Sequence, residues 1–177
     1  MNQTAVQRSY KNSLFREKKE LLSLYNALNG KDYVNPEALT ITTIEDVLYM
    51  GLKNDISFLI EDVMNLYEGQ SSWNPSMPLR GLFYISQIYQ GYVKEQHLDI
   101  YSSVLLRIPT PKYVVFYNGT RQEPERQELL LSASFINPEE RPCIECTALV
   151  LNINYGHNQE LMKACKKLHD YSYFVEQ

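Results

Sequence analysis

The sequence predicts an α/β domain, with a mixed β-sheet that carries helices on both faces. Apolar residues recur at helical spacing in three stretches, and short runs of β-branched and aromatic residues lie between these stretches. The eight prolines fall in loops, where they separate the elements. The chain has 177 residues, of which 44% are hydrophobic, as is typical of one globular domain. We therefore expect a polar segment over residues 1–13 and a single domain over residues 14–177.

The first helix is expected over residues 14–29. Ser13 can cap its first turn, and Gly30 follows in the position that often adopts a left-handed conformation. One face of this helix is apolar and carries Leu14, Leu21, Leu22, Tyr25 and Leu28.

Two further helices are predicted downstream. A helix is expected over residues 79–94, and Pro78 indicates its start, because proline is favoured at the first position of a helix. A shorter helix is expected over residues 158–168, and another helix could start within residues 171–176.

Five strands are predicted, over residues 41–51, 56–60, 64–70, 112–117 and 147–153. Short turns join the first three strands, so these should form an antiparallel meander, and a strand reached through a helix should join in parallel. Residues 120–142 are polar and are expected to be a loop.

The composition bounds the function. The net charge is −4, which does not favour binding of nucleic acid through the overall charge. It does not exclude a nuclease, because a nuclease active site is itself a carboxylate cluster neutralised by a cation.

The sequence contains no glycine-rich phosphate loop and no apolar run of about 20 residues, so neither a nucleotide cofactor nor a membrane partner is expected. The start has no signal-like apolar segment and there are three cysteines, which favours the cytoplasm.

Candidate catalytic residues lie on the second and third predicted strands. Asp55 starts the second strand, and Glu68 and Gln70 lie two residues apart on the third, so Glu68 and Gln70 share one face. A turn at residues 61–62 would set Asp55 level with Glu68. Two carboxylates that meet in this way can bind Mg²⁺ (or Mn²⁺), which can activate water for attack on a phosphodiester. Strand acids that only face solvent are the alternative.

The segment around these residues carries a family resemblance. The run NDISFLIEDVMNLYEGQSSWNPSMPLRGLFYI resembles the Rpn family of recombination-promoting nucleases, transposase-like members of the PD-(D/E)XK nuclease superfamily. Three other blocks resemble the same family in the same order: LLSLYNALNGKDY, IPTPKYVVFYNGT and LNINYGHNQELMKACKKLHDYSYFVE. The resemblance implies a restriction-endonuclease-like core with the order α-β-β-β-α-β. It also implies a Mg²⁺-dependent endonuclease that acts on DNA.

The resemblance also assigns roles to residues. It makes Asp55 the metal-binding aspartate and Glu68 the acid of the E-x-K or E-x-Q element, with Gln70 in the position where most of the superfamily has lysine. Glutamine offers only a neutral donor and acceptor, so a nearby cation could contribute, and Lys53 is one candidate. The pattern favours the other reading of Lys53, as a surface charge of an edge strand. Gly69 departs from the histidine usual in the family.

Two accessory residues are considered. Glu17 lies beside the apolar face of the first helix and could add an acid, or it could be a solvated charge. Arg80 lies with Tyr84 and Gln87 on one side of the second helix. It could bind a phosphate, pair with an active-site acid, or form a structural salt bridge.

Two rival functions stay open. The chain could be a catalytically inactive binding or regulatory module that keeps the nuclease fold, which Gln70, Gly69, the acidic pI and an end shorter than expected for the family all favour. It could also be a subunit of a homo-oligomer that needs another copy to complete a DNA groove.

Overall fold

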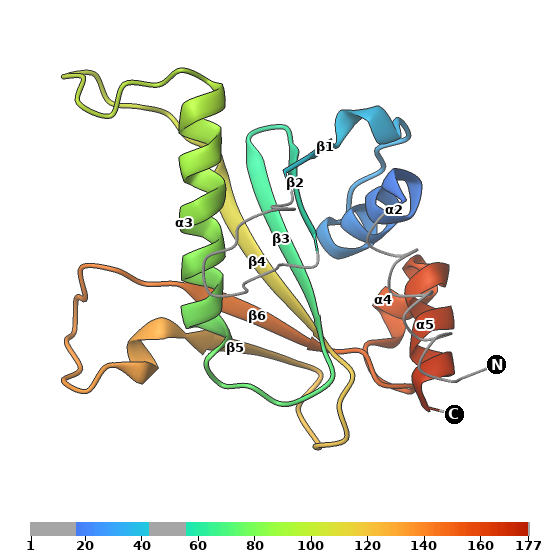
Figure 1. The fold of residues 1–177 in the computed structure, drawn as a ribbon. Helices are drawn as coiled ribbons and strands as arrows, with labels where there is room; N and C mark the ends of the chain where they lie inside the picture. The colour runs from blue at the N-terminus through green and yellow to red at the C-terminus, as the bar shows by residue number, and fades with distance from the viewer. Residues whose placement is uncertain (1–16, 43–55, 177) are drawn as a thin grey trace.

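The fold is a six-stranded mixed sheet with helices on both faces (Figure 1). The computed structural model describes residues 17–42 and 56–176. Within these residues the strands are β1 (Thr40–Ile41), β2 (Ile56–Ile60), β3 (Val63–Gln70), β4 (Thr110–Tyr117), β5 (Arg126–Leu130) and β6 (Thr147–Asn152). The helices are α2 (Lys18–Asn29), α3 (Met77–Glu95), α4 (Gln159–Ala164) and α5 (Lys166–Glu176), with short 3-10 turns η1 (Pro36–Ala38) and η2 (Leu131–Ser134).

The strand order is β1-β2-β3-β4-β6-β5. The strands β1, β2 and β3 pair antiparallel, β4 joins β3 in parallel through α3, and β6 joins β4 in parallel. The turn between β2 and β3 comprises Glu61 and Asp62, and Glu61 adopts a positive φ of 50°, which suits a tight two-residue hairpin. The predicted antiparallel hairpin and the parallel fourth strand are therefore confirmed.

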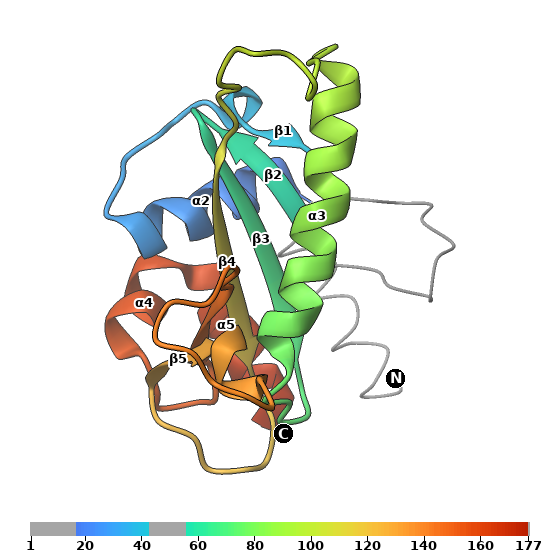
Figure 2. The same cartoon turned by 90° about the vertical axis from the view of Figure 1, so that its left-hand side faces the viewer.

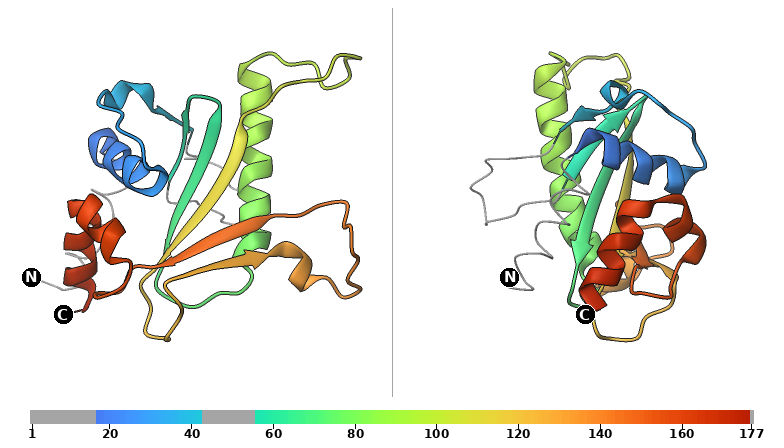
Figure 3. Two further views of the ribbon diagram at one scale, coloured as in Figure 1. Left: turned by 180° about the vertical axis from the view of Figure 1, so that it is seen from behind. Right: turned by 90° about the vertical axis from the view of Figure 1, so that its right-hand side faces the viewer.

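The two faces of the sheet bury separate cores. One face packs against α3, and its core includes Met64, Leu66 and Tyr84. The other face packs against α2, α4 and α5, and its core includes Tyr67 and Leu168 (Figures 2 and 3). Because side chains alternate along a strand, Glu68 lies on the α3 face, the same face as Leu66.

Two predictions about secondary structure are wrong. Residues 120–142 are not all loop, because Arg126–Leu130 forms β5 antiparallel to β6. This strand lies at the edge of the sheet and alternates exposed and half-buried residues, so its polar composition conceals it. The helix expected over 158–168 is interrupted at Cys165, whose extended backbone ends α4 and whose side chain is fully buried between the two helices and α2.

Other boundaries differ by a few residues. The first helix begins at Lys18, and the second begins at Met77 rather than at residue 79. Of the strand expected over residues 41–51, the structure describes only the start, and residues 43–55 lie outside the described part. Within the described ranges, no helix combines the length and apolar character that crossing a membrane requires.

The close approach of α3 to β4 generates a prediction. A Cβ atom added to Gly81 would lie 2.4 Å from two ring atoms of Tyr113, which is buried. Replacing Gly81 with alanine should therefore lower the free energy of unfolding by about 1–2 kcal/mol, because overpacking outweighs the gain in helix propensity. The measurement is urea unfolding followed by circular dichroism.

The matched control is Gly91→Ala in the same helix, where nothing lies within 4 Å of the added Cβ. This variant should gain about 0.5–1 kcal/mol from helix propensity alone. Equal effects of the two substitutions would contradict the close packing of α3 on β4.

Candidate functional site

Glu68 is a buried carboxylate near the end of β3, with an exposed fraction of 3%. Its Oε2 accepts a hydrogen bond of 2.6 Å from the Tyr113 hydroxyl on β4, and its Oε1 accepts one of 3.2 Å from Nη2 of Arg80 on α3. A buried carboxylate needs such partners, because burial of an unpaired charge is very costly. Three neighbouring elements therefore converge on one side chain.

Arg80 is the centre of this cluster. Its Nη2 also lies 3.1 Å from the Tyr84 hydroxyl, one helical turn further along α3. Its Nη1 lies 3.4 Å from Oε1 of Gln70. The structure thus brings together three residues that the sequence singled out, namely Glu68, Gln70 and Arg80. Of the roles considered for Arg80, the contacts match pairing with an acid, which fits both a structural salt bridge and the predicted pairing with a site acid.

Burial and contacts with Glu68 shift the pKa values of the groups around it. Burial raises the pKa of Tyr113 above its ordinary value, and the charge and hydrogen bond of Glu68 raise it further. Burial acts to lower the pKa of Arg80, but the Tyr84 hydroxyl and the Glu68 charge outweigh it, so this pKa is raised overall. Burial also raises the pKa of Tyr84. Both tyrosines stay protonated and Arg80 stays charged at neutral pH.

Two of the described residues carry oxygen atoms of the kind that divalent cations prefer. The Glu68 carboxylate and the Gln70 amide oxygen are hard oxygen donors on one face of β3. Each Glu68 oxygen already accepts a hydrogen bond, and the Arg80 guanidinium already faces Oε1 with a positive charge, so a cation would compete with Arg80 for the charge of this carboxylate. Over residues 17–42 and 56–176, no group of three or more His, Cys, Asp or Glu side chains could hold a metal ion.

Two of the other predicted residues, Asp55 and Lys53, lie outside the described residues. Glu17 is exposed at the start of α2, which packs on the opposite face of the sheet from Glu68.

Tyr113 is the member of the cluster that the sequence analysis missed. It begins the buried stretch of β4, and the parallel register pairs its Cα with that of Leu66. Its hydroxyl reaches Glu68 across a sequence separation of 45 residues. The one signal in the sequence was a tyrosine at the start of an apolar strand. The ring of such a tyrosine can be buried while its hydroxyl donates a hydrogen bond to a buried acid.

Trp73 lies in the loop between β3 and α3 and covers the end of the sheet. Its ring meets the Tyr117 ring edge-on at 5.8 Å, and the Arg121 guanidinium lies 5.2 Å from its centroid. Arg121 is also 2.7 Å from the Glu123 carboxylate. Trp73 therefore packs as a lid on the core, and Arg121 adds a cation at the same edge as Gln70.

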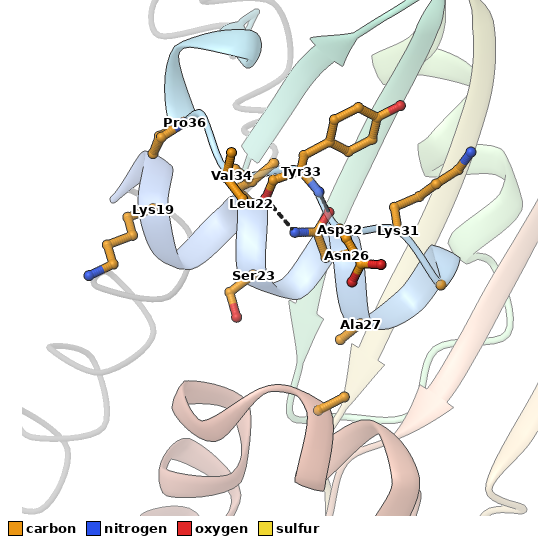
Figure 4. Close-up of a pocket in the computed structure, with 12 residues that line it drawn as sticks. Lys19, Leu22, Ser23, Asn26, Ala27, Lys31, Asp32, Tyr33, Val34 and Pro36 are labelled. Carbon is orange, nitrogen blue, oxygen red and sulfur yellow. Dashed lines mark hydrogen bonds between the residues drawn. The ribbon is translucent and has the colours of Figure 1, made fainter.

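A hollow of about 620 Å³ lies elsewhere, between α2, the segment that follows it and α4 (Figure 4). Asn26, which lines it, is occupied in holding the backbone N–H and carbonyl of Tyr33. Two charged residues around it, Lys19 and Lys31, extend away from the other lining residues in the close-up, whereas Asp32 lies beside Asn26. This hollow is remote from Glu68 and contains none of the predicted site residues.

Comparisons with known proteins give no match. No family model matches the chain, and no curated protein or solved structure matches it. The interpretation of the cluster therefore depends on its geometry and on the sequence blocks quoted above.

The charged hydrogen bond at Glu68 generates a prediction. Replacing Tyr113 with phenylalanine removes a donor from a buried carboxylate and should lower the free energy of unfolding by about 1.5–3 kcal/mol. The matched control is Tyr89→Phe, which removes a hydrogen bond of 2.6 Å to the neutral Pro109 carbonyl and should cost about 0.5–1.5 kcal/mol. Chemical denaturation of both variants measures the difference, and a Tyr113 variant as stable as the native chain would contradict an ionised Glu68.

Proposed function

We propose that this chain is a Mg²⁺-dependent DNA endonuclease with a restriction-endonuclease-like core. The element order α2, β1, β2, β3, α3, β4 supports the proposal, because it is the α-β-β-β-α-β order that the family resemblance implies. The pairing supports it as well, with an antiparallel hairpin followed by a parallel strand reached through a helix.

The observation that carries the proposal is the convergence of Glu68, Gln70 and Arg80. The Glu68 carboxylate has an exposed fraction of 3% and lies next to an amide and a guanidinium at the end of a strand. Such a buried charged group is unusual in a core that only supports the fold. Buried acids with specific charged partners are enriched at functional sites. The hydrogen-bonding groups of the cluster are also of the kinds that recognise phosphate.

The roles follow from the chemistry of each group. Asp55 and Glu68 would hold the metal ion. A hairpin register that sets these two residues opposite each other requires Ile56 to pair with Tyr67. This neighbouring pair is observed. When bound, the ion would activate water and stabilise charge on the phosphate. Gln70 would orient a water or a phosphate oxygen, and Arg80 would turn from Glu68 to a DNA phosphate.

A second candidate function is favoured by a specific observation. Arg80 and Tyr113 already satisfy both oxygens of Glu68, and Arg80 supplies the positive charge that a metal ion would supply. In a nuclease-fold module that only binds DNA or regulates a partner, this arrangement would be permanent. The two candidates differ in whether Mg²⁺ can compete with Arg80.

The first test of the proposed function concerns Asp55. Asp55→Asn should abolish Mg²⁺-dependent nicking of supercoiled plasmid. It should leave the melting temperature unchanged or raised, because removal of one of two neighbouring carboxylates relieves repulsion without metal. The control is Asp62→Asn, which alters an exposed acid in the turn between β2 and β3 and should retain full activity. Full activity in the Asp55 variant would remove this residue from the mechanism.

A second test separates an enzyme from a binding module through Gln70. In an enzyme, Gln70→Ala should lower the nicking rate by about 10²–10³, the loss typical of one transition-state donor. Gln70→Lys should retain or raise the rate, because an ammonium at this position can stabilise developing negative charge. In a binding module neither variant cleaves, and Gln70→Lys only strengthens DNA binding with a steeper salt dependence. Equal cleavage by the native chain, Gln70→Ala and Asp55→Asn would indicate a contaminating nuclease and would end the enzyme assignment.

A further inference from the structure

A pocket of about 260 Å³ lies where the chain passes from β6 into α4 and α5. Its lining includes Tyr155 and His157 from the turn, Met162 and Lys163 from α4, and His169 and Ser172 from α5. The pocket is on the sheet face that α2, α4 and α5 cover, opposite the side chain of Glu68. It is therefore separate from the cluster around Arg80.

Two polar atoms in this lining are buried without a partner. Among the described residues, neither Ser172 Oγ nor His157 Nδ1 has a hydrogen-bond partner. Ser172 has an exposed fraction of only 2%, and a serine inside a helix commonly bonds a backbone carbonyl one turn earlier, which this one does not. Buried polar atoms in folded proteins nearly always find partners, so these two atoms beside the pocket retain hydrogen-bonding capacity that no described residue uses.

The charge of the lining indicates the kind of ligand. The ionisable lining groups besides Tyr155 are Lys163 and two histidines, all of which can carry positive charge, and the lining contains no carboxylate. The Asp170 carboxylate lies close to His169, with its Oδ1 3.6 Å from Nδ1 of His169, and Asp170 is outside the lining. The pocket thus offers donors from three segments to one anion.

We propose that this pocket binds a phosphate monoester. A phosphate group presents three strong acceptor oxygens, which the hydroxyl of Ser172, the rings of His157 and His169 and the ammonium of Lys163 can meet from different directions. The volume lies below the range usual for drug-sized ligands, which suits a phosphate and the group attached to it. The ring of Tyr155 stands beside the pocket, half-exposed, and packs edge-on against the rings of His169 and Tyr173, so it offers that attached group a flat surface.

The same chemistry could come from a small metabolite or from the phosphorylated end of a nucleic acid strand. Isothermal titration of the full chain distinguishes these sources. The probes are inorganic phosphate, adenosine 5′-monophosphate with adenosine as its control, and a short single-stranded oligonucleotide with and without a 5′-phosphate. Saturable binding of the phosphorylated member of a pair, and not of its control, is the expected result.

Variants locate the binding. Ser172→Ala and Lys163→Gln should each weaken the binding about tenfold or more, the effect of removing one hydrogen bond to a charged group. Ser172→Ala should leave the melting temperature unchanged or raised, since it removes a buried hydroxyl that has no protein partner among the described residues. Lys166→Gln, an exposed lysine outside the lining, and His97→Asn, an exposed histidine distant in sequence, are the matched controls and should bind normally.

Two results would overturn the proposal. One is the absence of saturable binding by every phosphorylated probe. The other is binding that Ser172→Ala and Lys163→Gln leave unchanged, which would put the anion elsewhere on the chain. Because Gln70 lies outside the lining, binding should persist in Gln70→Lys, and the outcome is independent of whether the chain cleaves DNA.

Discussion

The ion pair between Glu68 and Arg80, completed by the Tyr113 hydroxyl, is the interaction on which the arrangement of the sheet and α3 depends. It ties β3, α3 and β4 to one buried charge. Gly81 has no side chain where α3 crosses Tyr113, and this lets the helix come close enough for Arg80 to reach the carboxylate. Removal of one partner of a buried pair costs more than the pair contributes, because the other charge stays buried. The elements around Glu68 are therefore interdependent.

In the proposed function Arg80 has two possible partners, the Glu68 carboxylate and a DNA phosphate. It neutralises Glu68 in the structure described, and it would compete with a bound cation for the charge of this carboxylate. The Arg80 side chain retains an exposed fraction of 32%, so it can reach solvent, or a phosphate, through movement of the side chain alone. The competition between guanidinium and metal for one carboxylate thus distinguishes an enzyme from a module that only keeps the fold.

The local sequence pattern predicts the bounds of an element well where the periodicity of its apolar residues matches the residues that are buried. The strand Ile56–Ile60 has the predicted bounds, and the observed start of α3 differs from the predicted one by only two residues. The pairing of Glu68 with Arg80 was one of the roles considered, because Arg80 follows a proline at a helix start close after the strand. Tyr113 could not be found in this way, since nothing local indicates which buried tyrosine lies against a distant acid. The edge strand β5 and the break at Cys165 were missed because solvation of an edge and burial of one thiol are set by tertiary packing.

The sequence separations within the Glu68 cluster have a consequence for the order of folding. The turn between β2 and β3 contains only two residues, so this hairpin can close early and at little entropic cost. Arg80 is 12 residues from Glu68 and Tyr113 is 45 residues away, so the acid cannot be fully satisfied until the crossover is complete. Pairings of this range slow folding, since chain closure must come before the contacts that reward it. In a chain whose α3 has not yet docked, Glu68 would be hydrated, and a charged group on an open strand discourages association with other chains. The acid that is buried in the finished fold would then protect the unfinished one from aggregation.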